Sequence, residues 1–232
     1  MGTIIRILHL QVTTLCLLIC LSWLFLSGGE NPDPERFREE IDTFLRWDSK
    51  NASPAKPVLF VGSSSIRLWR THDHFPELPV INRGFGGSHI SDVNYFIDIL
   101  VLKFRPALIV FYCGDNDIAD GKGPATVFSD FVKFTQTVHE KLPETGIIYL
   151  PIKPSPDRWH VWPAMREANI RIKDFCANES YLYYVDTATP MLGENERPIS
   201  ALFVSDSLHL SQTGYQLWTD LLTHELPALL KK

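Results

Sequence analysis

Short runs of consecutive apolar residues alternate along this chain with longer segments in which apolar positions recur every three or four residues. The short runs are typical of buried strands, and they span residues 58–61, 80–82, 107–112, 147–151 and 182–185. The longer segments have the spacing of amphipathic helices, and they span residues 91–104, 125–141, 163–178 and 211–230. Serine, threonine or proline stands near the start of these segments, where it favours the first helical turn.

Strands that alternate with helices in this way predict an α/β fold with a parallel sheet, because each connection must cross back over the sheet. Right-handed crossovers then place helices on both faces. We therefore expect a three-layer α/β/α sandwich around a five-stranded parallel sheet, of the flavodoxin-like type. The 232 residues suit one such domain with a short extension.

The N-terminal extension is the most apolar part of the sequence. Residues 4–26 are close to the roughly 20 residues that span a bilayer. This segment is either an uncleaved signal anchor or a cleaved signal peptide, and a buried core helix is a third alternative. Either of the first two predicts an exported domain, anchored in the membrane or secreted. We divide the chain into the N-terminal segment 1–29, a linker with a helix opening at Pro34 in 30–57, and the main domain 58–232.

Composition narrows the possible partners. The formal net charge is -5 and no long basic run occurs, so we expect no nucleic-acid partner. The four cysteines form neither a disulfide framework nor a CxxC pair, and no His/Cys cluster suggests a metal, so we expect no metal and no cofactor. The oligomeric state is left open.

Four polar stretches fall where the carboxyl ends of the predicted strands meet. They are Gly62 to Ser65, Asn82 to Ser88, Gly114 to Asp117 and Asp206 to His209. In a parallel α/β sheet, functional groups gather at this edge. A serine hydroxyl is a poor nucleophile at neutral pH and needs a positioned base. We therefore predict Ser64 as nucleophile, His209 as its base, and Asp206 as the carboxylate that orients the imidazole.

Attack on a carbonyl places negative charge on its oxygen, which needs hydrogen-bond donors. The backbone N–H groups of Ser64 and Gly87 and the side-chain amide of Asn116 are the predicted donors. Asp115 and Asp117, on either side of that amide, are interpreted as turn residues.

Together, Gly62-Ser63-Ser64-Ser65, Asn82-Arg83-Gly84-Phe85-Gly86-Gly87, Gly114-Asp115-Asn116-Asp117 and Asp206-Ser207-Leu208-His209 resemble the four blocks of the SGNH (GDSL-like) hydrolases. Their order and spacing also match. The resemblance implies the same nucleophile, the same Asp–His pair and an oxyanion hole from Ser64, Gly87 and Asn116. Which glycine of the Gly86-Gly87 pair is the donor depends on the alignment, and we choose Gly87. Members of this family are esterases, lipases, thioesterases and carbohydrate deacetylases that use no metal. Ser63 departs from the family's name-giving motif, which has Asp there.

A second Asp-x-x-His sequence competes for the acid–base role. Asp157 and His160 lie in a proline-rich loop after the fourth strand, but the pair before the last helix matches the family position better. The remaining histidines, His89 among them, are interpreted as surface or loop residues. Arg83 and Arg158 could contact a charged substrate, but each is more often a solvated side chain.

Trp159 and Trp162 stand on the same proline-rich loop. They are either a local hydrophobic cluster or a binding wall for an acyl chain or sugar ring. The sequence thus predicts a serine esterase acting on a small-molecule, glycan or lipid ester. A catalytically inactive glycan- or lipid-binding module, or an acyltransferase on the same fold, remains the alternative. A nucleotide-binding domain is disfavoured because the loop after the first strand lacks a phosphate cradle.

Overall fold

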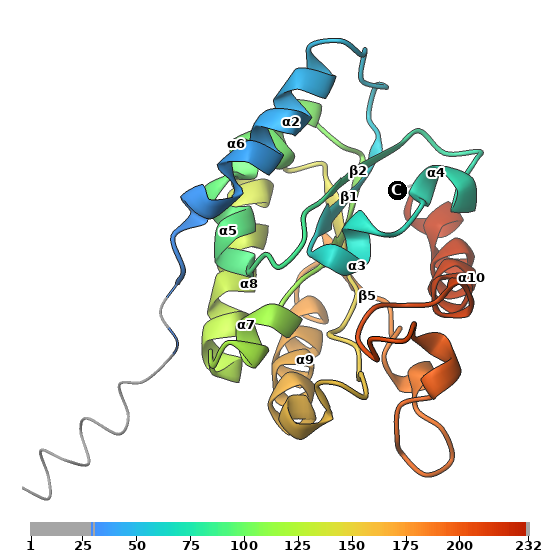
Figure 1. The fold of residues 1–232 in the computed structure, drawn as a ribbon. Helices are drawn as coiled ribbons and strands as arrows, with labels where there is room; N and C mark the ends of the chain where they lie inside the picture. Colours follow the sequence, from blue (N-terminus) through green and yellow to red (C-terminus); the bar gives the residue numbers. More distant parts are fainter. Residues whose placement is uncertain (1–28, 30, 231–232) are drawn as a thin grey trace, which may run out of the picture.

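Five parallel strands form the centre of the molecule (Figure 1). The computed structural model describes residue 29 and residues 31–230 of the chain. The strands are β1 (Val58–Gly62), β2 (Val80–Gly84), β3 (Leu108–Tyr112), β4 (Gly146–Tyr149) and β5 (Leu182–Tyr184). They pair in the order β2-β1-β3-β4-β5, and every pair is parallel. The predicted five-stranded parallel sheet and its flavodoxin-like order are confirmed.

Helices cover both faces of the sheet and make the outer layers of the sandwich. The α-helices are α2 (Arg38–Asp48), α3 (Ser64–Arg67), α4 (Thr71–His74), α5 (Ile90–Tyr95), α6 (Ile97–Leu100), α7 (Asp115–Ala119), α8 (Pro124–Lys141), α9 (Trp162–Cys176) and α10 (Gln212–Leu229). The short 3-10 helices are η1 (Pro34–Phe37), η2 (Leu102–Phe104), η3 (Trp159–Val161), η4 (Thr189–Met191) and η5 (Ser200–Leu202).

Alternate residues of each strand pack into two separate hydrophobic clusters. In β1, Leu59 and Val61 join the cluster beneath α2, α5, α8 and α9, whereas Val58 and Phe60 join the one beneath α10. This alternation follows from the two-residue period of a strand, whose side chains point to opposite faces. Every residue of β1 is buried, which explains why the strand appears in the sequence as an unbroken apolar run.

The helix predicted over residues 91–104 is three shorter pieces, namely α5, α6 and η2. Phe96 and Val101 separate them and have non-helical backbone angles. Both side chains are buried in the core. Burial of these residues therefore outweighs continuation of the helix.

The first three strands end level with one another, which gives the sheet one common carboxyl edge. Gly62 pairs with Gly84 of β2 and with Tyr112 of β3. A Cβ atom on Gly62 would lie 1.8 Å from the Tyr112 carbonyl oxygen, so only glycine allows β1 to approach β3 here. The following residue, Ser63, donates its backbone N–H to that same oxygen at 3.0 Å. The loops after β1, β2 and β3 consequently start side by side.

The predicted signal anchor or signal peptide, residues 1–29, lies almost entirely outside the described residues. Within the part of the chain that the structure describes, no helix is long and apolar enough to cross a membrane. The helix expected after Pro34 is present as η1 and α2, and Ile41 and Phe44 bury their side chains in the main core. Export and the proposed domain boundaries stay predictions.

Candidate active site

Ser64, His209 and Asp206 form one hydrogen-bonded chain at the carboxyl edge of the sheet. Ser64 is the first residue of α3, two positions after β1 ends. Its Oγ lies 3.0 Å from His209 Nε2, and His209 Nδ1 lies 2.6 Å from Asp206 Oδ2. The serine and the histidine are 145 positions apart in the sequence. The fold brings together the three residues that the sequence predicted as nucleophile, base and orienting carboxylate.

The loop that carries Asp206 and His209 holds both side chains in place. Asp206 Oδ1 accepts the backbone N–H groups of Leu208 and His209, each at 2.9 Å. Between the pair, Ser207 has the left-handed backbone conformation, with φ of 60°. The hydrogen bond from the His209 ring, followed by the two backbone N–H groups, lowers the pKa of Asp206 to about 2. Its carboxylate is therefore ionised at neutral pH and can hold a proton on Nδ1.

The three predicted oxyanion donors lie on the segments that follow β1, β2 and β3. Gly87 is exposed in the turn after β2 with φ of 77°, a conformation that favours glycine. Within the described residues its N–H has no hydrogen-bond partner in the protein. The N–H of Ser64 opens α3, where no intrahelical acceptor exists. Asn116, in the first turn of α7, donates one Nδ2 hydrogen to the Ser88 carbonyl at 3.0 Å and retains a second.

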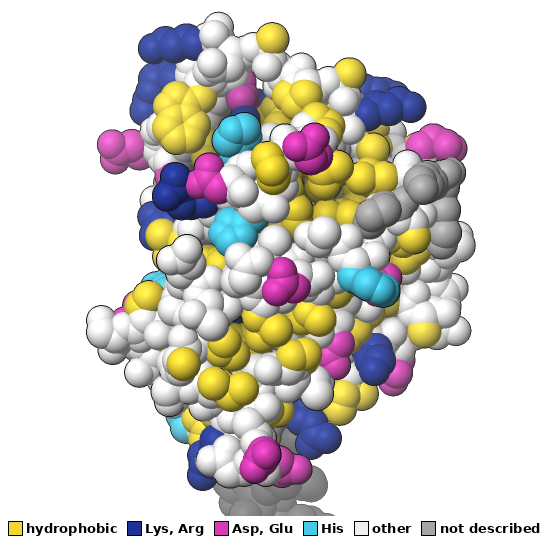
Figure 2. Space-filling model, turned by 90° about the vertical axis from the view of Figure 1, so that its right-hand side faces the viewer, with side chains coloured by type: hydrophobic (Ala, Val, Ile, Leu, Met, Phe, Trp, Pro, Cys, Tyr) yellow, Lys and Arg dark blue, Asp and Glu magenta, His cyan; other side chains and the backbone are white. Residues whose placement is uncertain are grey.

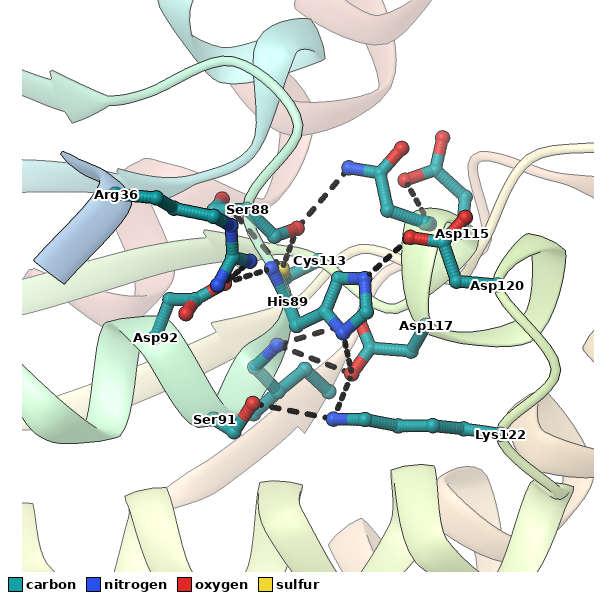
Figure 3. A network of polar contacts seen from close by, with 12 residues as sticks. Arg36, Ser88, His89, Ser91, Asp92, Cys113, Asp115, Asp117, Asp120 and Lys122 are labelled. Atoms are coloured by element: carbon teal, nitrogen blue, oxygen red, sulfur yellow. Dashed lines mark hydrogen bonds and ion pairs between the residues drawn. The ribbon is translucent and has the colours of Figure 1, made fainter. Parts of the chain in front are cut away.

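A buried polar network ties the loop after β2 to α7 (Figure 3). Asp117 accepts the backbone N–H of Ile90 at 3.2 Å and the Lys122 ammonium at 2.9 Å. Lys122 and Asp117 are fully shielded from solvent. His89 Nε2 contacts Asp120 at 2.8 Å, and the residue is 1% exposed. Of the two interpretations of His89, surface or loop residue, the structure supports the loop: the residue lies directly before α5, but its ring is enclosed between α5 and α7.

A second buried ion cluster lies on the opposite side of Asn116, and the sequence did not indicate it. Asp115 accepts from Lys153 Nζ at 3.0 Å, and Arg158 Nη1 lies 3.3 Å from the same carboxylate oxygen. Burial alone would raise the pKa of Asp115, but the charges of Lys153 and Arg158 outweigh burial and lower it. Asp115 is thus a buried anion rather than only a turn residue.

Two arginines predicted to be solvated are largely enclosed. Arg158 has a side-chain exposure of 15% and also donates to Asn116 Oδ1 at 2.9 Å. Arg83 is buried and pairs with Asp48 of α2. Their burial could not be predicted, because their partners Asp48 and Asn116 are distant in the sequence.

Trp159 and Trp162 stack on each other, with ring centroids 6.0 Å apart and planes 18° from parallel. The Arg197 guanidinium covers Trp159 at 5.0 Å, and Trp162 packs against the main core. These contacts fit a local hydrophobic cluster, and a role in substrate binding stays a prediction. His160, between the two tryptophans, is exposed. The histidine in contact with Ser64 is His209.

A crevice of about 830 Å³ opens beside the Asp206–His209 loop, between α4 and α10. Figure 2 views the molecule from this side and shows patches of apolar side chains interrupted by acidic and histidine side chains. Leu68 and Val204 line the crevice and are 45% and 44% exposed. Among the described residues, no group of three or more His, Cys, Asp or Glu side chains is placed to hold a metal.

A family model described as the GDSL-like lipase/acylhydrolase family matches residues 67–217. The chain belongs to this family. The matched segment contains Gly87, Asn116, Asp206 and His209, and it begins just after Ser64. The resemblance to SGNH (GDSL-like) hydrolases is confirmed, and membership of the GDSL-like family supports a hydrolase that acts on esters. No curated protein matches the chain.

Solved structures share the fold of this GDSL-like protein. A protein from Streptococcus pneumonia whose name describes it as a platelet activating factor has a TM-score of 0.74 and 19% identity. The match covers 92% of this chain and 99% of that protein's chain. A GDSL-like lipase from Bacteroides thetaiotaomicron has a TM-score of 0.70 and 23% identity, over 82% and 97%. A variant of an acetyl-xylooligosaccharide esterase from Geobacillus Stearmophilus has a TM-score of 0.60 and 15% identity, over 75% and 95%.

Proposed function

We propose that this protein hydrolyses carboxylic esters through an acyl-enzyme formed on Ser64. The observation that carries the proposal is the continuous chain from Ser64 Oγ to His209 Nε2 at 3.0 Å and from His209 Nδ1 to Asp206 Oδ2 at 2.6 Å. In this chain Asp206 fixes the proton on Nδ1, so Nε2 is free to accept the serine proton.

The reaction then proceeds in two halves. Ser64 Oγ attacks the ester carbonyl as its proton moves to His209 Nε2, and the tetrahedral oxyanion forms. The N–H groups of Ser64 and Gly87 and the free Nδ2 hydrogen of Asn116 stabilise that charge. His209 returns the proton to the leaving alcohol, which leaves the acyl group on Ser64. His209 then takes a proton from water, and the resulting hydroxide attacks the acyl carbonyl. As the bond between the acyl carbon and Ser64 Oγ breaks, His209 returns that proton to Oγ, which releases the acid and restores the free serine.

The crevice beside His209 is lined by Asp206 and His209 but not by Ser64, Gly87 or Asn116, so we propose it only for the part of a substrate that extends past His209. Its volume of about 830 Å³ and its exposed Leu68 and Val204 suit an ester with an apolar portion. The related structures include a lipase and an acetyl-xylooligosaccharide esterase by name. A substrate panel therefore needs short and long p-nitrophenyl esters together with acetylated sugars.

Two matched substitutions test the proposal on purified protein. Ser64→Ala and His209→Ala should each lower kcat on the best ester by about 10³-fold or more, because the nucleophile or its base is lost. His160→Ala, at the exposed histidine of the competing Asp-x-x-His sequence, should retain wild-type kcat. If His160→Ala and His209→Ala lowered kcat equally, the assignment of His209 as the base would be wrong.

A fluorophosphonate probe separates the remaining alternatives. It should label wild-type protein and leave Ser64→Ala unlabelled. An unlabelled wild type with no ester turnover would instead indicate a binding module. If the protein is labelled but turns over the ester only when an alcohol acceptor is supplied, it is an acyltransferase.

A further inference from the structure

The dipeptide Asp157-Arg158 touches both halves of the proposed site. The backbone N–H of Asp157 donates to the carbonyl of Ser207, within the acid–base loop, at 3.1 Å. The next residue, Arg158, donates from Nη2 to Asn116 Oδ1 at 2.9 Å. The segment after β4 therefore bridges the loop that holds the base and the helix that holds the amide.

The Arg158 contact decides which way the Asn116 amide points. In the observed orientation the amide oxygen meets the guanidinium, and the amide nitrogen meets the Ser88 carbonyl at 3.0 Å. Rotating the amide by half a turn would set its oxygen against the Ser88 oxygen and its NH₂ against the guanidinium. Two acceptors and two donors would then face each other, and neither hydrogen bond could form. One Nδ2 hydrogen is left over in the observed orientation for an oxyanion.

The charge of Arg158 is only partly neutralised where it meets the amide. Asp115 is the carboxylate it contacts, and Lys153 already donates a hydrogen bond to the same oxygen. Nη1 of Arg158 is buried and lies 3.3 Å from that carboxylate oxygen, but within the described structure it makes no hydrogen bond. A cation on the amide oxygen withdraws electron density from the amide, which makes its N–H a stronger donor.

We propose that Arg158 is a positioning residue of the active site, which fixes and polarises the Asn116 amide so that its free N–H stabilises the oxyanion. Its buried Nη1 argues for action through Asn116 rather than through contact with substrate. The inference rests on the proposed ester hydrolysis for its kinetic consequence, whereas the orientation of the amide is a property of the free protein.

A double-mutant cycle on kcat tests the inference. Arg158→Gln should lower kcat on a short p-nitrophenyl ester by about 10- to 100-fold with KM unchanged, because a transition-state interaction is lost. In an Asn116→Ala background the same substitution should cost less than about 3-fold, since the amide through which Arg158 acts is gone. Equal losses in both backgrounds would overturn the proposal.

Two further variants guard against a merely structural explanation. Arg197→Gln removes a guanidinium that stacks on the neighbouring Trp159, and it should leave kcat within about 2-fold. Arg158→Lys keeps the charge but loses the planar fork, so kcat should fall between wild type and Arg158→Gln. If Arg158→Gln does not fold, the double-mutant cycle is measured with Arg158→Lys. The loss of kcat should again be smaller in the Asn116→Ala background than in wild type.

A spectroscopic readout is independent of turnover. In ¹⁵N-labelled wild-type protein, the two Asn116 side-chain amide protons should be well separated in shift and slow to exchange with water. Arg158→Gln should bring the shifts together and speed the exchange, whereas Arg197→Gln should not. Unchanged Asn116 resonances in Arg158→Gln would refute the positioning role. A wild type that hydrolyses no ester would defeat the proposed function, and the amide resonances would still decide the role of Arg158.

Discussion

The substitution Asp206→Asn probes the His209 tautomer with almost no change of shape. The new side chain can keep its oxygen on the backbone N–H groups of Leu208 and His209, which Asp206 Oδ1 accepts at 2.9 Å. Its NH₂ then takes the place of Oδ2, 2.6 Å from His209 Nδ1. A donor at that position favours an unprotonated Nδ1. The ring proton moves to Nε2, which can no longer accept the proton of Ser64.

The expected loss of kcat in Asp206→Asn is smaller than the loss in a catalytic triad whose carboxylate is buried. There, the same exchange lowers kcat by about 10⁴. The side chain of Asp206 is 47% exposed, so solvent screens its attraction for the imidazolium. The tautomer effect is geometric and survives screening. We therefore expect kcat to fall by about 10²–10³, which corresponds to about 2.7–4 kcal/mol of lost transition-state stabilisation.

The assay is steady-state hydrolysis of a short p-nitrophenyl ester by wild type and Asp206→Asn at neutral pH. KM should stay the same, because the substitution acts on proton transfer rather than on binding. Circular dichroism of both proteins checks that the fold is intact. A loss of less than about 10-fold in a folded variant would show that Asp206 does not control the tautomer, and the mechanism would need another orienting group.

Two further predictions concern stability. The folded-state pKa of Asp206 lies below its ordinary 3.8, at about 2, because the carboxylate accepts hydrogen bonds from the His209 ring and from two backbone N–H groups. These hydrogen bonds therefore stabilise the protein above about pH 4, and that stabilisation is lost as the pH falls through 2. The difference in unfolding free energy between wild type and Asp206→Asn should accordingly shrink between pH 4 and pH 2, and a constant difference would contradict the linkage. Lys153→Met removes one of the two cations that contact the buried Asp115 and leaves it Arg158 and the neutral donors. The substitution should cost about 3 kcal/mol, seen as a lower urea midpoint. Adding Asp115→Asn should recover part of that loss, and an unchanged midpoint in the single variant would show that the pair adds no stability.

The parts of this fold that could be predicted from sequence are those fixed by local patterns. Buried strands such as β1 and β3 are unbroken apolar runs, because both of their faces are covered. The polar stretches that follow them must then meet at one edge, whatever the details of the connections. Ser64 and Asn116 could be placed near each other for that reason alone.

The buried charges could not be predicted, because their partners are distant in the sequence. Lys153 and Asp115 are 38 positions apart, and Arg158 and Asn116 are 42 apart. A charged side chain in a loop is usually exposed, so each of these residues alone favours a solvated interpretation. Only the paired arrangement makes burial possible, since an unpaired buried charge costs several kcal/mol. The burial of His89 could not be predicted for the same reason, since its partner Asp120 is 31 positions away.

The first turn of α7 shows what the buried charges accomplish together. Successive residues of a helix point about 100° apart, so Asp115, Asn116 and Asp117 face three directions. Asp115 is held by Lys153 and Arg158, and Asp117 is held by Lys122 and the Ile90 N–H. The amide between them has no freedom to shift with its helix, because both neighbours are anchored to different parts of the sheet edge. In the proposed mechanism, Asn116 must stabilise a transient negative charge without reorganising, and a donor of that kind benefits from such fixation. The lysines and the arginine that surround the Gly114-Asp115-Asn116-Asp117 turn would supply it.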